Sequence, residues 1–206
     1  MLHLETIDSA TLGLLTGLQE MPGLTDTRLV GGTALALQFG HRISVDLDLF
    51  ACNLQEDFIS IISAIKKEKW HLEIRRQTTN ILVAMINQVK VDIVNYPYPW
   101  LDPEVRSGKI RLASPKDIAA MKLAAITNRG TKKDFTDLYY LLKRYSLRQM
   151  LDFYSKKYDD ASRFMVIKSL TYFDDAEEEI MPGLIDNSLS WSIIKEEIRR
   201  EVKLVL

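Results

Sequence analysis

The stretch over residues 30–50 constrains the fold of this chain more than any other. It opens on a Gly-Gly-Thr turn at 31–33, continues as a short apolar run of helical length, and closes on Asp46 and Asp48. A glycine turn that leads into a helix binds anions, because its free N–H groups and the helix dipole point at the ligand. Carboxylates at i and i+2 of a strand share a face, which favours a cation between them. The stretch therefore predicts phosphoryl or nucleotidyl transfer from a nucleoside triphosphate.

Hydrophobic periodicity divides the chain into an α/β part and a helical part. The alternation over 44–50 places Ser44, Asp46 and Asp48 on one strand face, and Asn87-Gln88 predicts a tight turn between two strands. The composition changes from mixed α/β to all-α near residue 114, so we place a domain boundary there, between 1–113 and 114–206. The pattern predicts helices over 5–20, 33–39 and 55–69, strands over 27–30, 44–50, 72–76, 80–86, 90–94 and 109–113, and then helices over 115–128, 132–144, 147–157, 160–172 and 189–204.

Asp92 lies in the middle of the predicted strand 90–94, between two apolar residues. A lone carboxylate that faces away from the core is a natural third ligand beside Asp46 and Asp48. The alternative is an exposed edge charge, and spacing alone leaves both interpretations open.

A second polar stretch runs from Lys122 to Asp137. Lys122 and Arg129 are two helical turns apart, and Asp134 and Asp137 are three residues apart, so each pair shares a helix face. In one interpretation these four residues form a structural salt-bridge network that ties two helices together. In the other, Lys122 contacts triphosphate oxygens while the carboxylates position it or a substrate hydroxyl.

Arg42 and the three histidines have ordinary explanations. Arg42, just before the Asp46 strand, is a candidate substrate or phosphate contact, although a solvated loop charge is the simpler interpretation. The histidines His3, His41 and His71 show no metal-ligand spacing, and we expect all three at the surface.

The composition limits the partners and the cellular compartment that we expect for this protein. The net charge of −1 gives no bulk attraction to nucleic acid, so any such contact needs a local basic patch. The single cysteine, Cys52, excludes an intramolecular disulfide and fits a reducing cytoplasm. We find no signal-peptide pattern and no apolar run of the roughly 18 residues that a membrane span needs. We therefore expect a cytoplasmic protein without a membrane partner.

Basic residues interleaved with aromatic ones in the C-terminal helices form a candidate RNA-facing surface. An ordinary solvated face is the alternative, and the acidic run 174–179 argues against a continuous basic groove. The basic residues are Lys156, Lys157, Arg163, Lys168, Arg199, Arg200 and Lys203.

Two motifs in this order resemble a known family. Gly-Gly-Thr-Ala-Leu is followed by Arg-x-Ser-x-Asp-x-Asp-Leu-Phe, and then by Lys-Leu-Ala-Ala-x-x-x-Arg-x-x-x-Lys-Asp-x-x-Asp-Leu. The pattern is similar to the AbiEii/AbiGii-type nucleotidyltransferase toxins of the polymerase-β-like superfamily, over roughly residues 25–145. The chain departs from it with Thr33 in place of a frequent Ser, which retains the hydroxyl, and with Lys133 in place of an Arg, which loses a bidentate contact.

The resemblance implies an α+β fold, with a nucleotidyltransferase-like mixed β-sheet, flanking helices and a helical C-terminal region. It also implies Mg²⁺, or Mn²⁺, as cofactor. Asp46 and Asp48 would hold the metal, and Asp92 lies where the superfamily often carries a third carboxylate. The implied catalytic residues are Asp46, Asp48, Asp92, Lys122 and Asp134, the implied nucleotide-binding residues are Gly31, Gly32, Thr33, Lys122 and Arg129, and Asp137 would support them.

The resemblance implies transfer of NMP from an NTP to an acceptor, with RNA such as tRNA as the candidate. It also implies a toxin of a type IV toxin–antitoxin or phage-defence system with a cognate antitoxin encoded nearby. Two other classes of function use the same residues. One is a nucleotide-binding or protein-interaction module that has kept the fold without turnover, and the other is phosphotransfer to a protein or small molecule.

Overall fold

A seven-stranded mixed sheet lies in the N-terminal half of the computed structural model, which describes residues 2–159 and 162–206. Its strand order is β3-β4-β5-β2-β1-β7-β6, with β2 parallel to β5 and β1 parallel to β7. The mixed sheet predicted from the sequence is confirmed. The strands are β1 (Arg28–Val30), β2 (Leu47–Ala51), β3 (Leu72–Gln77), β4 (Ile81–Ile86), β5 (Val89–Asn95), β6 (Val105–Ser107) and β7 (Ile110–Leu112).

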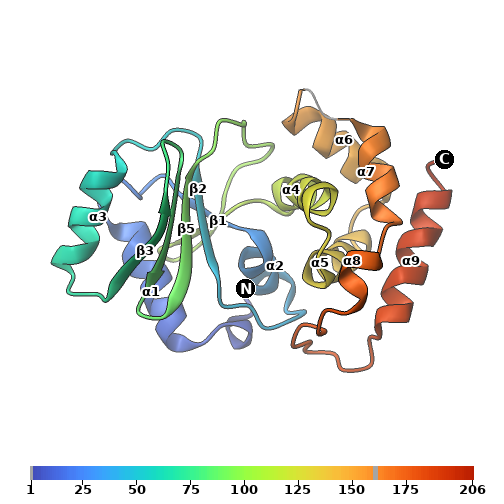
Figure 1. Cartoon of the computed structure of the whole chain (residues 1–206), viewed down its shortest axis with the longest axis horizontal. Helices are drawn as coiled ribbons and strands as arrows, with labels where there is room; N and C mark the ends of the chain where they lie inside the picture. Colours follow the sequence, from blue (N-terminus) through green and yellow to red (C-terminus); the bar gives the residue numbers. More distant parts are fainter. Residues whose placement is uncertain (1, 160–161) are drawn as a thin grey trace.

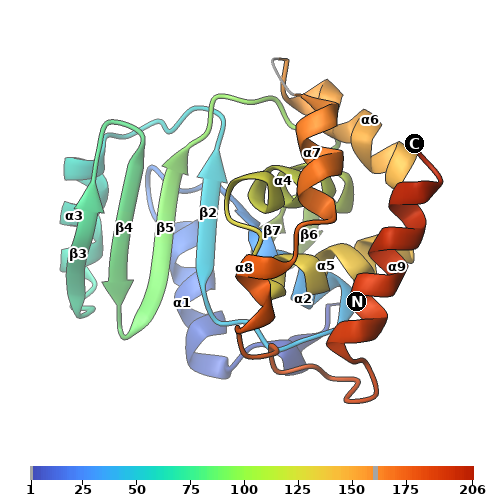
Figure 2. The same ribbon diagram turned by 45° about the vertical axis from the view of Figure 1, so that its right-hand side comes forward.

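Helices cover the two faces of the sheet unequally (Figure 1). Helices α1 (Ser9–Glu20) and α3 (Phe58–Lys67) lie on one side, and α2 (Gly31–Phe39) and the C-terminal helices lie on the other. Figure 2 shows the near face of β3, β4 and β5 with no helix in front of it. The remaining helices are η1 (Leu4–Thr6), α4 (Pro115–Asn128), α5 (Lys132–Leu142), α6 (Leu147–Lys157), α7 (Arg163–Leu170), α8 (Asp174–Glu177) and α9 (Trp191–Lys203).

Local signals fix several element ends. The Ser114 side chain accepts a hydrogen bond from Asp117 N–H at the start of α4, and Thr131 caps α5 in the same way. Gly40 ends α2 in the left-handed region at φ 67°. Asn87 and Gln88 both have positive φ, at 48° and 68°, which confirms the predicted tight turn between β4 and β5.

Other boundaries differ from the predictions. The predicted helix 5–20 is interrupted before Asp8, whose side chain caps α1, so η1 and α1 are separate. The predicted strand 44–50 begins only at Leu47, because the backbone before it bonds elsewhere: Ile43 N–H donates to Gly183 O and Ser44 N–H to Thr6 O. Strand β6 and helix α8 were not predicted. The first two residues of the predicted helix 160–172 lie outside the described residues.

One cluster of buried apolar side chains connects the sheet to the C-terminal helices. It includes Leu29 and Leu49 from the sheet, Leu123 from α4 and Ile198 from α9. The domain boundary near residue 114 stays a prediction. None of the described helices is long and apolar enough to cross a membrane.

Candidate functional site

Asp48 and Asp92 lie side by side on the sheet face that points away from α1 and α3. They are paired residues of the parallel strands β2 and β5, so their side chains share a face. Their strand neighbours Leu47 and Ile93 are buried on the opposite face. Asp46 lies one residue before β2, in the loop that leads into it. Of the three predicted carboxylates, the sheet therefore brings two together directly, and the loop adds the third nearby.

The negative charge of this pair of carboxylates is only partly compensated. Burial and the neighbouring Asp92 raise the pKa of Asp48 to about 6, and Asp46 acts in the same direction. Asp92 Oδ2 accepts a hydrogen bond of 2.8 Å from Lys90 Nζ. Asp92 Oδ1 is buried and has no hydrogen-bond partner among the described residues. A cation between the two carboxylates would offset their repulsion and satisfy that oxygen.

The residues present fit a hard divalent cation. Carboxylate oxygens are the ligands that Mg²⁺ and Mn²⁺ prefer, and the unpaired Asp92 Oδ1 is such an oxygen. Within residues 2–159 and 162–206, however, no three His, Cys, Asp or Glu side chains are grouped so that they could hold a metal together. The structure thus contains a pair of carboxylates, and the three-ligand set of Asp46, Asp48 and Asp92 stays a prediction.

The two glycines of the first motif bring backbone close to charged groups. Gly31 has φ 70°, and a Cβ on it would collide with a carboxylate oxygen of Asp48. A Cβ on Gly32 would collide with the Arg42 guanidinium and would lie 3.2 Å from Asp137 Oδ2. Only glycine allows both approaches, because it has no Cβ. The turn at 31–32 therefore lies between the Asp48 carboxylate and the charged groups of the second motif.

Thr33 positions the loop that carries Asp46. Its hydroxyl lies 2.8 Å from the Ser44 hydroxyl and donates a short hydrogen bond to the backbone oxygen of Asp46. Thr33 is buried at the N-terminus of α2. The family resemblance implied that Thr33 binds the nucleotide. In the structure its hydroxyl holds the backbone of Asp46, and a phosphate contact of Thr33 stays a prediction.

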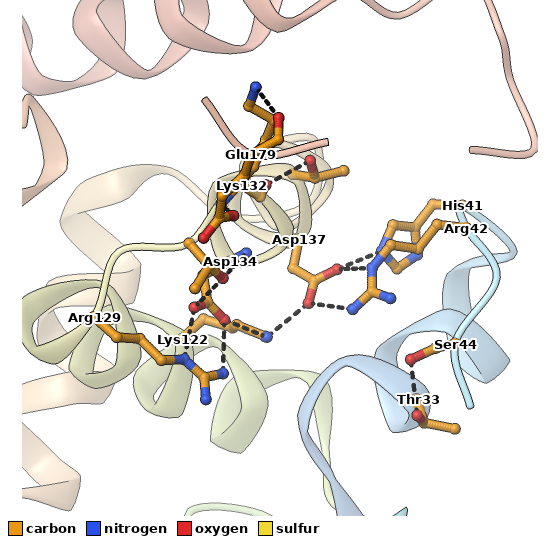
Figure 3. A network of polar contacts seen from close by, with 12 residues as sticks. Thr33, His41, Arg42, Ser44, Lys122, Arg129, Lys132, Asp134, Asp137 and Glu179 are labelled. Atoms are coloured by element: carbon orange, nitrogen blue, oxygen red, sulfur yellow. Dashed lines mark hydrogen bonds and ion pairs between the residues drawn. The ribbon is translucent and has the colours of Figure 1, made fainter. Parts of the chain in front are cut away.

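The second motif forms a buried ion-pair network at the junction of α4 and α5 (Figure 3). Lys122 Nζ lies 2.9 Å from Asp134 Oδ1 and 2.7 Å from Asp137 Oδ2. Arg129 contacts both Asp134 oxygens, at 2.9 and 3.2 Å. Lys122 is only 5% exposed. The contacts therefore show the salt-bridge network between two helices that was one of the two interpretations. A contact between Lys122 and triphosphate stays a prediction.

Two residues that the sequence placed at the surface belong to this network. Arg42 donates to Asp137 Oδ1 through Nε at 2.7 Å and to Oδ2 through Nη2 at 3.0 Å. His41 Nε2 lies 2.8 Å from the same Oδ1. Arg42 is 3% and His41 2% exposed, so the surface predictions for both were wrong. The reason is a partner 95 or 96 positions away, which no local pattern reveals.

Charge compensation sets the protonation of the network. Burial alone would raise the pKa of Asp137, but Lys122 and Arg42 hold it well below its usual value. Burial likewise opposes the charge on Asp134, and Lys122 and Arg129 outweigh it, so its pKa is also lowered. Burial lowers the pKa of His41 despite its bond to Asp137, which favours a neutral ring that donates from Nε2. Lys122 and Arg129 both interact through their charge with Asp48, so the network and the carboxylate pair share one electrostatic field.

The network predicts a defined loss of stability in acid. Asp134 and Asp137 have lower pKa values folded than unfolded, so their stabilisation is complete above the unfolded value and is lost as the pH falls through the folded one. We expect the free energy of unfolding in urea to decrease steeply below about pH 4. Asp137→Asn should show a clearly smaller decrease over the same range. An equal acid response of wild type and variant would contradict this account.

Sequence reasoning missed one residue that contacts the carboxylate pair. Lys90 lies two positions before Asp92 on β5, so it shares the face of Asp92, and its side chain is 44% exposed. The strand alternation contains the signal, because i and i+2 residues point the same way. The ammonium lies where it competes with a cation for Asp92 Oδ2.

A family model and a related protein each match most of this chain. A family model described as "Nucleotidyl transferase AbiEii toxin, Type IV TA system" matches residues 14–202. An uncharacterized protein from Aquifex aeolicus is 36% identical over 186 residues, which cover 86% of this chain and 87% of that protein.

Solved structures share the fold at low sequence identity. JHP933 from Helicobacter pylori superposes with a TM-score of 0.61 at 17% identity, covering 97% of this chain and 93% of that one. MenT4, a nucleotidyltransferase toxin from Mycobacterium tuberculosis, gives a TM-score of 0.61 at 14% identity, covering 93% of this chain and 79% of the other. At these identities the likeness shows the fold alone.

Proposed function

Since this chain belongs to the AbiEii family of nucleotidyl transferase toxins, we propose that it transfers NMP from an NTP to an RNA acceptor such as tRNA. The enzyme class, nucleotidyltransferase, follows from the family. The observation that supports a working site is the pair Asp48 and Asp92, which lie side by side against the Gly31 turn with Asp92 Oδ1 unpaired. We further propose that the protein acts in the cytoplasm as the toxin of a type IV pair, restrained by a cognate antitoxin.

In this proposal Asp46 and Asp48 would hold Mg²⁺, or Mn²⁺ in its place, and Asp92 would either join them as a third ligand or act as a base. When bound, the metal supplies a Lewis acid that draws charge from the triphosphate and the attacking hydroxyl. Thr33 fixes the loop of Asp46, and β2 fixes Asp48, so both carboxylates are held before the substrate arrives. The backbone at 31–32, beside the helix N-terminus of α2, is placed to receive phosphate oxygens.

The chemical step is an in-line displacement at the α-phosphorus. The acceptor hydroxyl oxygen forms the new P–O bond, the bond to the bridging oxygen breaks, and pyrophosphate leaves. The hydroxyl proton needs an acceptor, and Asp92 Oδ1 is a carboxylate oxygen without a competing hydrogen bond. Asp92 is therefore assigned either as this base or as a third metal ligand.

The ion-pair network is assigned a positioning role. Asp137 holds Arg42 against the glycine turn and holds Lys122 in place at the same time. Together Lys122 and Arg129 place positive charge within electrostatic range of Asp48, where negative charge builds up during transfer. Contact of Lys122 with the triphosphate requires it to exchange a carboxylate for a phosphate, whereas the Arg129 side chain is 64% exposed.

One observation favours a non-catalytic alternative, a nucleotide-binding module with the same fold. Lys122 is already bonded to two carboxylates, so it needs no phosphate to satisfy its charge. Binding of NTP without transfer would support this alternative over the enzyme.

The test is incubation of the protein with Mg²⁺, total RNA and each NTP labelled at the α-phosphate in turn. We expect label to enter RNA from at least one NTP, and Asp46→Ala to reduce the transfer to background. An NTP labelled at the γ-phosphate distinguishes the phosphotransfer alternative, because only that reaction transfers the γ label. Equal background transfer by wild type and Asp46→Ala across all substrates would contradict the proposal.

A further inference from the structure

Three arginine side chains lie side by side on one sheet face, beyond the residues assigned to the reaction. Arg106 of β6 pairs with Arg111 of β7 in the antiparallel register. The parallel register of Leu29 with Leu112 puts Arg28 of β1 level with Arg111. Arg28 in turn pairs with Phe50 of β2. Paired residues share a face, so the arginine row of Arg28, Arg106 and Arg111 continues across the sheet to Phe50.

The arginine row lines a cavity of about 450 Å³ at the end of β2. Trp100 also lines it, and the Arg28 guanidinium carbon lies 4.5 Å from the centre of the Trp100 ring. The two acidic residues of the lining are Asp26 and Glu104. The row therefore brings three positive charges together against two negative ones, in a chain whose total charge is −1.

Among the described residues, Glu104 is the one carboxylate that forms ion pairs with the arginine row. It forms a short ion pair with Arg106 Nε, and its Oε2 lies 3.9 Å from Arg28 Nε. Arg111 instead donates to backbone oxygens of Gln19 and Thr27. Arg28 also donates to the backbone oxygen of Asp102 at 2.9 Å. Burial lowers the pKa of both Arg28 and Arg111, although the charge of Glu104 opposes this shift. Like charges side by side across strands also repel each other, and an anion in the cavity would relieve both costs.

We propose that the arginine row binds the phosphodiester backbone of the single-stranded RNA acceptor next to the reacting end. This inference rests on the proposed function and adds where the acceptor lies. Guanidinium groups match phosphate oxygens in pairs, which favours arginine over lysine at such a site.

The position of the arginine row relative to the carboxylates supports this acceptor path. Asp48 and Phe50 share a face of β2 two residues apart, a separation of about 7 Å, and Arg28 lies beside Phe50. Arg106 is three strand spacings from Phe50, about 14 Å away. Single-stranded RNA bound along the arginine row would therefore reach Asp48 over the length of a few nucleotides.

The candidate RNA-facing surface in the C-terminal helices is a weaker RNA site than the arginine row, as its ion pairs show. Lys157 is only 1% exposed and bonds to Asp117 at 2.8 Å. Arg163 pairs with Asp152, and Arg200 pairs with two glutamates of α9. Three of the seven basic residues of this surface are thus already paired with carboxylates.

The structure offers matched variants for a test by fluorescence anisotropy, with short labelled oligouridylate and neither NTP nor metal. Arg106 and Arg75 are both exposed strand arginines, with 69% and 58% side-chain exposure, and each pairs with the glutamate two residues before it. We expect Arg106→Gln to weaken RNA binding about 3- to 10-fold and to reduce the salt slope by about 1. Arg75→Gln, on the opposite edge strand, should leave the affinity and the salt slope unchanged.

Glu104→Gln supplies a change of opposite sign, because it removes the competing carboxylate and should tighten RNA binding severalfold. A purely structural role for Glu104 would not give tighter binding. Equal weakening by Arg106→Gln and Arg75→Gln, no tightening by Glu104→Gln, or no RNA binding by wild type would each overturn the proposal. Complete displacement of RNA by inorganic phosphate at equal ionic strength would assign the cavity to free phosphate instead. This assay measures RNA binding without nucleotide transfer. A negative result would therefore overturn the arginine row as an RNA site, while the labelled-NTP experiment would still decide the proposed reaction.

Discussion

Asp48→Asn is expected to reduce nucleotide transfer by at least about 1,000-fold, because a neutral amide is a poor ligand for the divalent cation that we propose for the reaction. Asparagine keeps the shape of the side chain on β2, so the sheet should remain intact. Initial rates of α-label incorporation into RNA give the comparison. Glu73→Gln removes a half-exposed carboxylate from β3 of the same sheet, and it should retain the wild-type rate. Comparable rates for Asp48→Asn and wild type would remove Asp48 from the reaction.

In the absence of metal, the folded state of Asp48→Asn should be more stable than that of wild type. The pKa of Asp48 is raised to about 6 in the folded protein, so its ionised form destabilises the fold. This cost is absent below the unfolded value of about 4, grows as the pH rises and is complete above about 6. Urea unfolding in EDTA at about pH 8 should therefore show Asp48→Asn more stable by up to about 3 kcal/mol. A less stable variant under these conditions would mean that Asp48 supports the fold rather than a cation.

Asp137→Asn should have the opposite effect and destabilise the fold by about 3–5 kcal/mol, because it leaves two buried cations without their shared carboxylate. Lys122 lies 2.7 Å from Asp137 Oδ2, and Arg42 contacts both oxygens. The amide keeps the volume but withdraws the charge. Denaturant unfolding at neutral pH measures the difference.

The matched control for this variant is Asp152→Asn. Asp152 pairs with Arg163 at 2.8 Å, but both side chains are about half exposed. An exposed pair contributes at most about 1 kcal/mol, so this variant should unfold close to wild type. If Asp137→Asn and Asp152→Asn lower the free energy of unfolding equally, burial of the network does not contribute to stability.

Short-range patterns predicted only part of the carboxylate pair. Alternation in β2 and β5 put Asp48 and Asp92 each on the polar face of its strand. The strand order that makes them neighbours is a long-range property, because β2 and β5 are separated in sequence by α3, β3 and β4. The family resemblance supplied that step, since it implied the third carboxylate on a nearby strand.

Burial of polar groups could not be predicted in the same way. Arg42 and His41 have polar neighbours and no periodic pattern, so a loop at the surface was the natural interpretation. They are buried because Asp137 compensates them and because residues 183–185 bond to the backbone at 41–43. The arginine row was also missed, because β6 is only three residues long and gives no alternation to read.

The contact between Arg42 and Asp137 also orders events during synthesis of the chain. The two residues are 95 positions apart, so only Thr6 and Thr33 hold the loop that leads to Asp46 and Asp48 until α5 has been made. The backbone of this loop is held later still, by Gly183 and Ile185. A nascent chain that has completed β1, α2 and β2 therefore lacks the contacts with Asp137, Gly183 and Ile185 that hold this loop in the finished protein. We expect the loop to reach its final conformation only when translation is nearly finished.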